Sequence, residues 1–144
     1  MPVWNYRRPV IISNSSTDLT DYQVLVILNT ADLISEGKKR SDCDDIRFTD
    51  SDDSTLLSYW IESGCNTSLT KIWAKVPEIS ATSTKTIYVY YGNPDATYLS
   101  NGDAVVEFFD DFNDRVINTN KCVIYASPGS ITETNGYIEV YRNG

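Results

Sequence analysis

Histidine is absent from all 144 residues of the sequence. Histidine is the commonest general base and the commonest transition-metal ligand in proteins. Its absence excludes catalytic schemes that activate serine or cysteine with histidine. Catalysis by two carboxylates is not excluded, although the composition alone gives no reason to expect an enzyme.

Basic residues and long apolar runs are also scarce. Twelve lysines and arginines face 20 acidic residues, a formal net charge of −8. Nucleic acids and anionic membranes would repel such a surface. No apolar run approaches the roughly 20 residues that span a bilayer. We therefore expect neither nucleic-acid binding nor membrane insertion.

Short β-branched segments separated by turn residues fill the chain, whereas long helical periodicity is missing. This pattern predicts an all-β, antiparallel β-sandwich or jelly-roll-like fold with at most one short helix, over Thr30–Ser35. Thr30 is the expected helix cap, and Gly37 the expected stop. The expected strands are Asn5–Ile12, Tyr22–Leu28, Ile46–Thr49, Leu56–Glu62, Lys71–Val76, Thr84–Tyr91, Ala104–Phe109, Cys122–Tyr125, Ser130–Thr132 and Tyr137–Tyr141.

Turn residues predict how these segments connect. Asp50–Ser54 is the expected tip of a hairpin between the third and fourth strands, and Asn135-Gly136 the tip of a second hairpin. Pro77 is expected to end its strand and start a loop. Asn101-Gly102 marks a boundary between a sandwich core, residues 1–100, and C-terminal strands, residues 101–144.

Five ordered segments resemble one known family. They read WNYRRPVIISNSS, LTDYQVLVILNT, SDCDDIRFTDSDDSTLLSYWIESG, TKIWAKVP and TKTIYVYYGNPDAT. Together they resemble the domain-of-unknown-function 2341 family, with Asp53 where glycine is frequent and Ser58 where proline is frequent. The resemblance implies a module of secreted or surface-anchored proteins and no established activity.

A second resemblance concerns the C-terminal part. Phe108–Val140 is similar to the opening of a concanavalin-A-like lectin or glucanase domain, but it is too short for a whole jelly roll. Residues 101–144 therefore either complete the first sandwich or form a truncated lectin-like domain.

The three cysteines bear on location. Cys43 and Cys65 flank the expected hairpin, so pairing of its strands would bring them close enough for a disulfide. A disulfide would place the chain in an oxidising, extracellular or cell-surface environment. The alternative is two buried thiols in a cytosolic protein. Cys122 is left over, and an apolar, buried role is expected for it.

Acidic clusters are candidate calcium ligands. Six aspartates fall between residues 42 and 53, and Asp50 and Asp52 begin a run like the start of a calcium loop. Asp111 belongs to a second cluster, in the lectin-like segment. A structural Ca²⁺ is the only cofactor that the sequence suggests. The alternative is ordinary turn chemistry, in which Asp and Ser bond to nearby backbone.

Aromatic residues suggest a ligand surface. Strand alternation places Trp60, Trp73, Tyr88 and Tyr90 on the more polar faces of their strands. Exposed rings beside hydrogen-bonding groups would stack on sugar rings. The alternative is that another layer, such as Phe108, Phe109 and Phe112, covers them.

These features favour a non-catalytic extracellular module that binds a polysaccharide or cell-surface glycan. The alternative is a structural or adhesive module that contacts other surface proteins or forms homo-oligomers by strand addition. A glycoside hydrolase using Glu62 with Glu107 or Asp111 is the third reading. Asn14-Ser15-Ser16 and Asn66-Thr67-Ser68 fit the glycosylation sequon, and they fit Asn/Ser turns as well.

Overall fold

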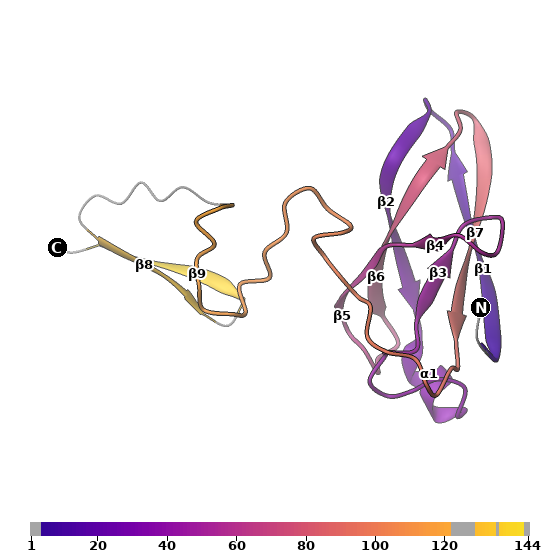
Figure 1. The fold of residues 1–144 in the computed structure, drawn as a ribbon, viewed down its shortest axis with the longest axis horizontal. Helices are drawn as coiled ribbons and strands as arrows, with labels where there is room; N and C mark the ends of the chain where they lie inside the picture. The colour runs from indigo at the N-terminus through magenta and orange to yellow at the C-terminus, as the bar shows by residue number, and fades with distance from the viewer. Residues whose placement is uncertain (1–3, 122–128, 135, 143–144) are drawn as a thin grey trace. The chain divides into compact units, whose positions relative to one another are not determined.

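The computed structural model describes residues 4–121, 129–134 and 136–142. The chain forms two compact units, Met1–Glu107 and Phe108–Gly144, so the observed boundary lies a few residues after the expected one (Figure 1).

Two antiparallel sheets form the first unit (Figure 1). One sheet has the order β1-β7-β3-β4, and the other has the order β2-β6-β5. Their bounds are Tyr6–Asn14 (β1), Leu19–Leu28 (β2), Arg47–Thr49 (β3), Leu56–Leu57 (β4), Tyr59–Ser63 (β5), Thr70–Ile79 (β6) and Ser83–Tyr91 (β7). The predicted antiparallel β-sandwich is therefore confirmed.

The core lies between the inward faces of the two sheets. In β6, Ile72, Ala74 and Val76 are fully buried, and in β7, Ile87 and Val89 face them from the other sheet. Side chains two residues apart share one face of a strand, so this burial follows from the sequence pattern. The alternate residues of β6, such as Trp73, lie on the outer face.

The expected strand Leu56–Glu62 is divided at Ser58. β4 pairs with β3, so that Phe48 faces Leu57, whereas β5 pairs with β6 in the other sheet. The predicted hairpin through Asp50–Ser54 is confirmed, but its second strand is only the two-residue β4 and does not continue into β5. One continuous run of chain thus contributes to both sheets.

Two local predictions are corrected, and a third is untested. Pro77 lies inside β6, where it is tolerated because pairing with β5 ends at Ala74 and pairing with β2 skips Asp21. Ala104–Phe109 is not a strand, because the carbonyl of Gly102 accepts the N–H groups of both Val105 and Val106 and turns the chain. The expected strand Cys122–Tyr125 lies outside the described residues.

The short helix α1 spans Thr30–Ser35, as predicted, but Asn29 rather than Thr30 caps it. The Asn29 side chain accepts the N–H of Asp32, because the oxygen of an N-cap must reach the donors of the first turn. Gly37 follows the C-cap with a φ of 67°, which confirms its role as the stop.

The second unit contains the antiparallel hairpin of β8 (Gly129–Thr134) and β9 (Tyr137–Arg142). Thr134 pairs with Tyr137, so the two strands are joined where the sequence predicts a turn. Gly136 takes a φ of 90°, a conformation that disfavours a side chain.

Candidate functional site

A row of three apolar side chains crosses the outer face of the β2-β6-β5 sheet. Leu25 of β2 faces Trp73 of β6, and Trp73 faces Trp60 of β5. Leu25 and Ile27 are 42% and 48% exposed, and both tryptophans are partly exposed. We call Leu25, Trp73 and Trp60 the tryptophan row.

Charged side chains flank the tryptophan row. The indole N–H of Trp73 donates to Glu62 Oε2 at 2.7 Å, which fixes the edge of the ring. Lys71 lies 3.8 Å from Glu62, and Lys75 lies 3.7 Å from Asp21. The row therefore combines apolar surface with the donors and acceptors that polar ligands need.

Residues after β7 run along the free edge of β5 and reach one end of this face. The N–H of Asn101 donates to the Tyr59 carbonyl at 2.9 Å, and the N–H of Ile61 donates to Ser100 Oγ at 2.8 Å. Gln23, on the outer face of β2, donates to the Val105 carbonyl at 2.9 Å. Val105 is buried outside the sandwich core, so this segment packs at the Gln23 end of the face and leaves Leu25 and Ile27 exposed.

Tyr88 and Tyr90 lie on the outer face of the other sheet, in β7. The guanidinium of Arg7 lies 4.6 Å from the centre of the Tyr88 ring, and Trp4 contacts the Tyr90 ring edge-on. The Tyr90 hydroxyl donates to Asp53, and burial and this carboxylate raise its pKa. The four predicted aromatics therefore fall into two pairs, Trp60 with Trp73 on one sheet and Tyr88 with Tyr90 on the other.

Asp50 and Asp52 make contacts typical of a turn. Asp50 accepts the N–H of Ser51 and also pairs with Lys85 of β7, both at 2.5 Å. Asp52 accepts the N–H groups of Ser54 and Thr55 and the Thr55 hydroxyl, and these bonds hold its pKa well below the usual range. In the described part of the chain, no three His, Cys, Asp or Glu side chains are placed to hold a metal ion. Calcium binding stays a prediction.

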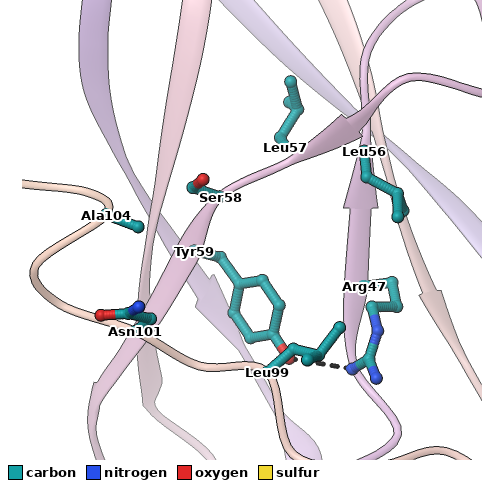
Figure 2. A pocket seen from close by; sticks show the side chains of 8 residues that line it. All are labelled: Arg47, Leu56, Leu57, Ser58, Tyr59, Leu99, Asn101 and Ala104. Carbon is teal, nitrogen blue, oxygen red and sulfur yellow. Dashed lines mark hydrogen bonds between the residues drawn. The ribbon is translucent and has the colours of Figure 1, made fainter.

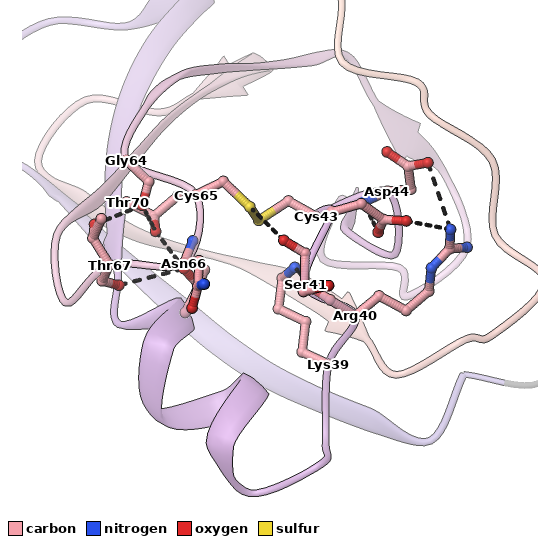
Figure 3. The surroundings of a disulfide bond; sticks show 12 residues. Lys39, Arg40, Ser41, Cys43, Asp44, Gly64, Cys65, Asn66, Thr67 and Thr70 are labelled. Atoms are coloured by element: carbon pink, nitrogen blue, oxygen red, sulfur yellow. Dashed lines mark hydrogen bonds and ion pairs between the residues drawn. A yellow bond between two sulfur atoms is a disulfide. The ribbon is translucent and has the colours of Figure 1, made fainter.

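The pairing of Cys43 with Cys65 is confirmed (Figure 3). Their Cα atoms are 6.2 Å apart, and the bond joins the chain before β3 to the loop after β5. Closing a loop of this length stabilises a fold by about 3 kcal/mol in the chain-entropy model. The disulfide therefore links two loops that adjoin strands of different sheets.

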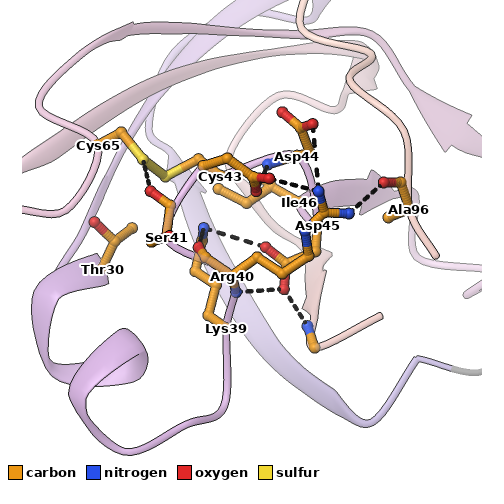
Figure 4. Close-up of polar contacts among 12 residues, drawn as sticks. Thr30, Lys39, Arg40, Ser41, Cys43, Asp44, Asp45, Ile46, Cys65 and Ala96 are labelled. Atoms are coloured by element: carbon orange, nitrogen blue, oxygen red, sulfur yellow. Dashed lines mark hydrogen bonds and ion pairs between the residues drawn. A yellow bond between two sulfur atoms is a disulfide. The ribbon is translucent and has the colours of Figure 1, made fainter. Parts of the chain in front are cut away.

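A buried ion pair between Lys39 and Asp45 is the main feature that sequence reasoning missed (Figure 4). Lys39 Nζ lies 3.2 Å from Asp45 Oδ1, and neither side chain is exposed. Asp45 Oδ2 accepts the N–H groups of Arg40 at 3.0 Å and Gly92 at 2.9 Å. Burial lowers the Lys39 pKa, and Asp45 opposes this shift. Lys39 lies in a short run of basic residues followed by acids, and this local pattern carries no signal of a buried charge.

A small hollow lies where β4 passes into β5 (Figure 2). Its volume is about 240 Å³, below the roughly 300–1,000 Å³ of typical ligand pockets. Arg47 donates to the Tyr59 hydroxyl at 3.0 Å along its wall. The exposed tryptophan row is therefore a better candidate for a large ligand than this hollow.

The carboxylates proposed for hydrolysis are differently placed. Glu62 is engaged with Trp73 and Lys71, and Glu107 is exposed at the end of the first unit. Asp111 belongs to the second unit. These positions give no support for two carboxylates facing each other at the separation that glycoside hydrolysis needs.

Glu133 of β8 is a buried acid in the second unit. It is 5% exposed, and its Oε1 accepts the N–H of Arg115 at 3.2 Å, whereas no donor among the described residues reaches its Oε2. Burial raises the Glu133 pKa, and the nearby carboxylates of Asp110 and Asp114 raise it further. Folding therefore favours the protonated carboxyl.

We expect Glu133→Gln to stabilise the β8–β9 hairpin at pH 7. The Glu133 pKa in the folded state lies above its ordinary value of 4.5. The wild-type carboxyl is therefore protonated below pH 4.5, and its contribution to the free energy of unfolding is complete there. This contribution is lost as the pH rises through the folded pKa. Glutamine is neutral throughout, so the difference between the variants should vanish at low pH. Amide hydrogen exchange of the hairpin between pH 4 and 8 measures this, with Glu139→Gln as control; equal protection at pH 7 contradicts it.

The family model described as "Domain of unknown function (DUF2341)" matches residues 42–126, more than half of the chain. The chain therefore belongs to this family. The match begins after the first two of the five segments that resemble the family, and it extends into the second unit.

No curated protein and no solved structure gives a match, and the concanavalin-A-like resemblance finds no support here. Within the described residues, no helix is long and apolar enough to cross a membrane.

Proposed function

We propose that the first unit is a non-catalytic, extracellular carbohydrate-binding module of a larger secreted protein. The observation that supports this is the tryptophan row, which lays apolar side chains across three strands beside Lys71 and Glu62. Sugar rings have flat apolar faces edged by hydroxyls. Such rings fit partly exposed tryptophans with hydrogen-bonding groups nearby. The disulfide supports an oxidising location, although it does not identify one.

Trp73→Ala is expected to weaken glycan binding by about 2 kcal/mol or more, roughly 30-fold in Kd, because it removes the central ring of the row. A glycan array followed by titration of the best ligand, with and without a calcium chelator, measures the effect. Tyr98→Ala, which removes an exposed ring outside the row, is the matched control.

Leu25→Ala is a second variant that distinguishes loss of the binding surface from loss of the fold. Leu25 is exposed at one end of the row, so its truncation should weaken binding while the thermal unfolding midpoint stays near that of the wild type. Retained affinity in both Leu25→Ala and Trp73→Ala contradicts the proposed surface. Unfolding of Trp73→Ala together with unchanged binding by Leu25→Ala identifies the tryptophans as structural.

The alternative proposal is a structural or adhesive module that assembles by strand addition. It is favoured by the edge positions of β1 and β2, which are nine and ten residues long and carry the exposed side chains of Ile11 and Ile27. Long, unpaired strand edges are templates for pairing with another chain. Light scattering discriminates, since a strict monomer over a wide concentration range contradicts self-assembly.

A further inference from the structure

The two glycosylation sequons occupy very different surroundings. Asn14 ends β1, and its Nδ2 donates to the carbonyls of Thr17 at 2.8 Å, Ser80 at 3.0 Å and Ile79 at 3.3 Å. Its Oδ1 accepts the N–H of Ser16 at 3.0 Å. The Asn14 amide thus ties the turn after β1 to the end of β6. A sugar on Nδ2 would displace these bonds.

Asn66 lies in the loop of residues 64–69 between β5 and β6, directly after Cys65 (Figure 3). Its side chain is exposed, and its carboxamide makes no hydrogen bond within the described part of the chain. The third sequon residue, Ser68, is exposed as well. The attachment atom is therefore accessible and carries no structural role that a glycan would disturb.

The backbone around Asn66 is nevertheless well held. The Asn66 N–H donates to Thr30 Oγ1 at 2.9 Å, and the Thr67 carbonyl accepts the N–H groups of Thr30 and Ala31. The loop thereby packs against the first turn of α1, and the disulfide fixes its other side. A bulky group on the Asn66 side chain leaves all of these backbone contacts intact.

We propose that Asn66 is an N-glycosylation site and that Asn14 is not. The donor is a lipid-linked oligosaccharide pyrophosphate. Nδ2 of Asn66 forms a bond to the anomeric carbon, the bond from that carbon to the pyrophosphate oxygen breaks, and the amide releases one proton. No oxidation or reduction takes place. The proposal depends on the extracellular location in the proposed function and is independent of the tryptophan row.

The test is secretion of the chain from a host that contains an oligosaccharyltransferase, followed by intact mass measurement before and after enzymatic N-glycan removal. One oligosaccharide should be lost from the wild type. It should be missing in Asn66→Gln and in Ser68→Ala. Ser16→Ala removes the other sequon and should keep the glycan; this variant retains the Asn14 contacts, because Ser16 contributes only its backbone N–H.

An unmodified Asn66 in secreted chain that contains the Cys43–Cys65 disulfide overturns the proposal, as does a glycan at Asn14. Thiol alkylation before and after reduction verifies the disulfide in each sample. Occupancy at Asn66 in a protein that binds no glycan leaves this inference standing and removes the proposed function. The two failures are therefore distinguishable.

Discussion

Asp45→Ala is expected to destabilise the first unit by about 3–5 kcal/mol. The substitution leaves Lys39 buried without its counter-charge, and breaking a buried ion pair by removing one partner carries this cost. It also removes the acceptor of the Arg40 and Gly92 N–H groups. Urea unfolding followed by tryptophan fluorescence measures the change.

Asp44→Ala is the matched control for Asp45→Ala. Asp44 is the adjacent residue and lies 3.6 Å from Arg40 with a partly exposed side chain. Pairs of this kind contribute about 1 kcal/mol or less. Equal losses in Asp44→Ala and Asp45→Ala would show that burial of the Lys39 pair has no bearing on stability.

Gly92→Ala is expected to cost at least about 2 kcal/mol. Gly92 takes a φ of 83°, and a left-handed conformation costs a residue with a side chain about 1–2 kcal/mol. An added Cβ would also lie 2.7 Å from the Lys38 carbonyl oxygen and 2.6 Å from Cδ2 of Tyr6. Backbone must move to relieve the first contact, which adds to the conformational cost.

Gly37→Ala separates these two costs. Gly37 also has a positive φ, of 67°, but no atom of the part of the chain that the structure describes lies within 4 Å of its added Cβ. Its loss in the free energy of unfolding should therefore be smaller than that of Gly92→Ala. Equal losses contradict the steric argument.

The double variant Asp45→Ala/Gly92→Ala should lose less free energy of unfolding than the sum of the two single losses, because both substitutions act on the same hydrogen bond.

The Asp45–Gly92 contact joins two of the segments that resemble the family. Asp45 belongs to the DIRF segment and Gly92 to the YYGNP segment, 47 residues apart. Both segments can be recognised in the sequence, but the sequence does not show that Asp45 and Gly92 are in contact. The N–H of Gly92 reaches the carboxylate of Asp45 only because β3 and β7 are neighbours in one sheet.

Strand alternation predicted the faces of single strands well but not the assembly of the site. In β6, the buried set Ile72, Ala74 and Val76 and the outward position of Trp73 both agree with the sequence pattern. Alternation carries no information on which sheet a strand joins. Tyr88 and Trp73 therefore looked equivalent in sequence, although they lie on different sheets.

Two further features were hidden for related reasons. The division at Ser58 depends on long-range pairing of β4 and β5 with different partners. The burial of Lys39 depends on Asp45, which supplies a counter-charge inside the fold. Local composition cannot show either arrangement, since charged residues are normally exposed unless paired.

The Cys43–Cys65 disulfide also bears on how a surface module would respond to tension. It spans 22 residues, and β3, β4 and β5 all lie within the closed loop. A force applied along the chain would extend the strands on either side of the disulfide. Residues 43–65 would not be extended, because the disulfide joins the two ends of the loop. At about 3.3–3.6 Å per extended residue, roughly 70–80 Å of contour length is withheld. Because the loop includes strands of both sheets, a piece of each would remain shielded from the applied load.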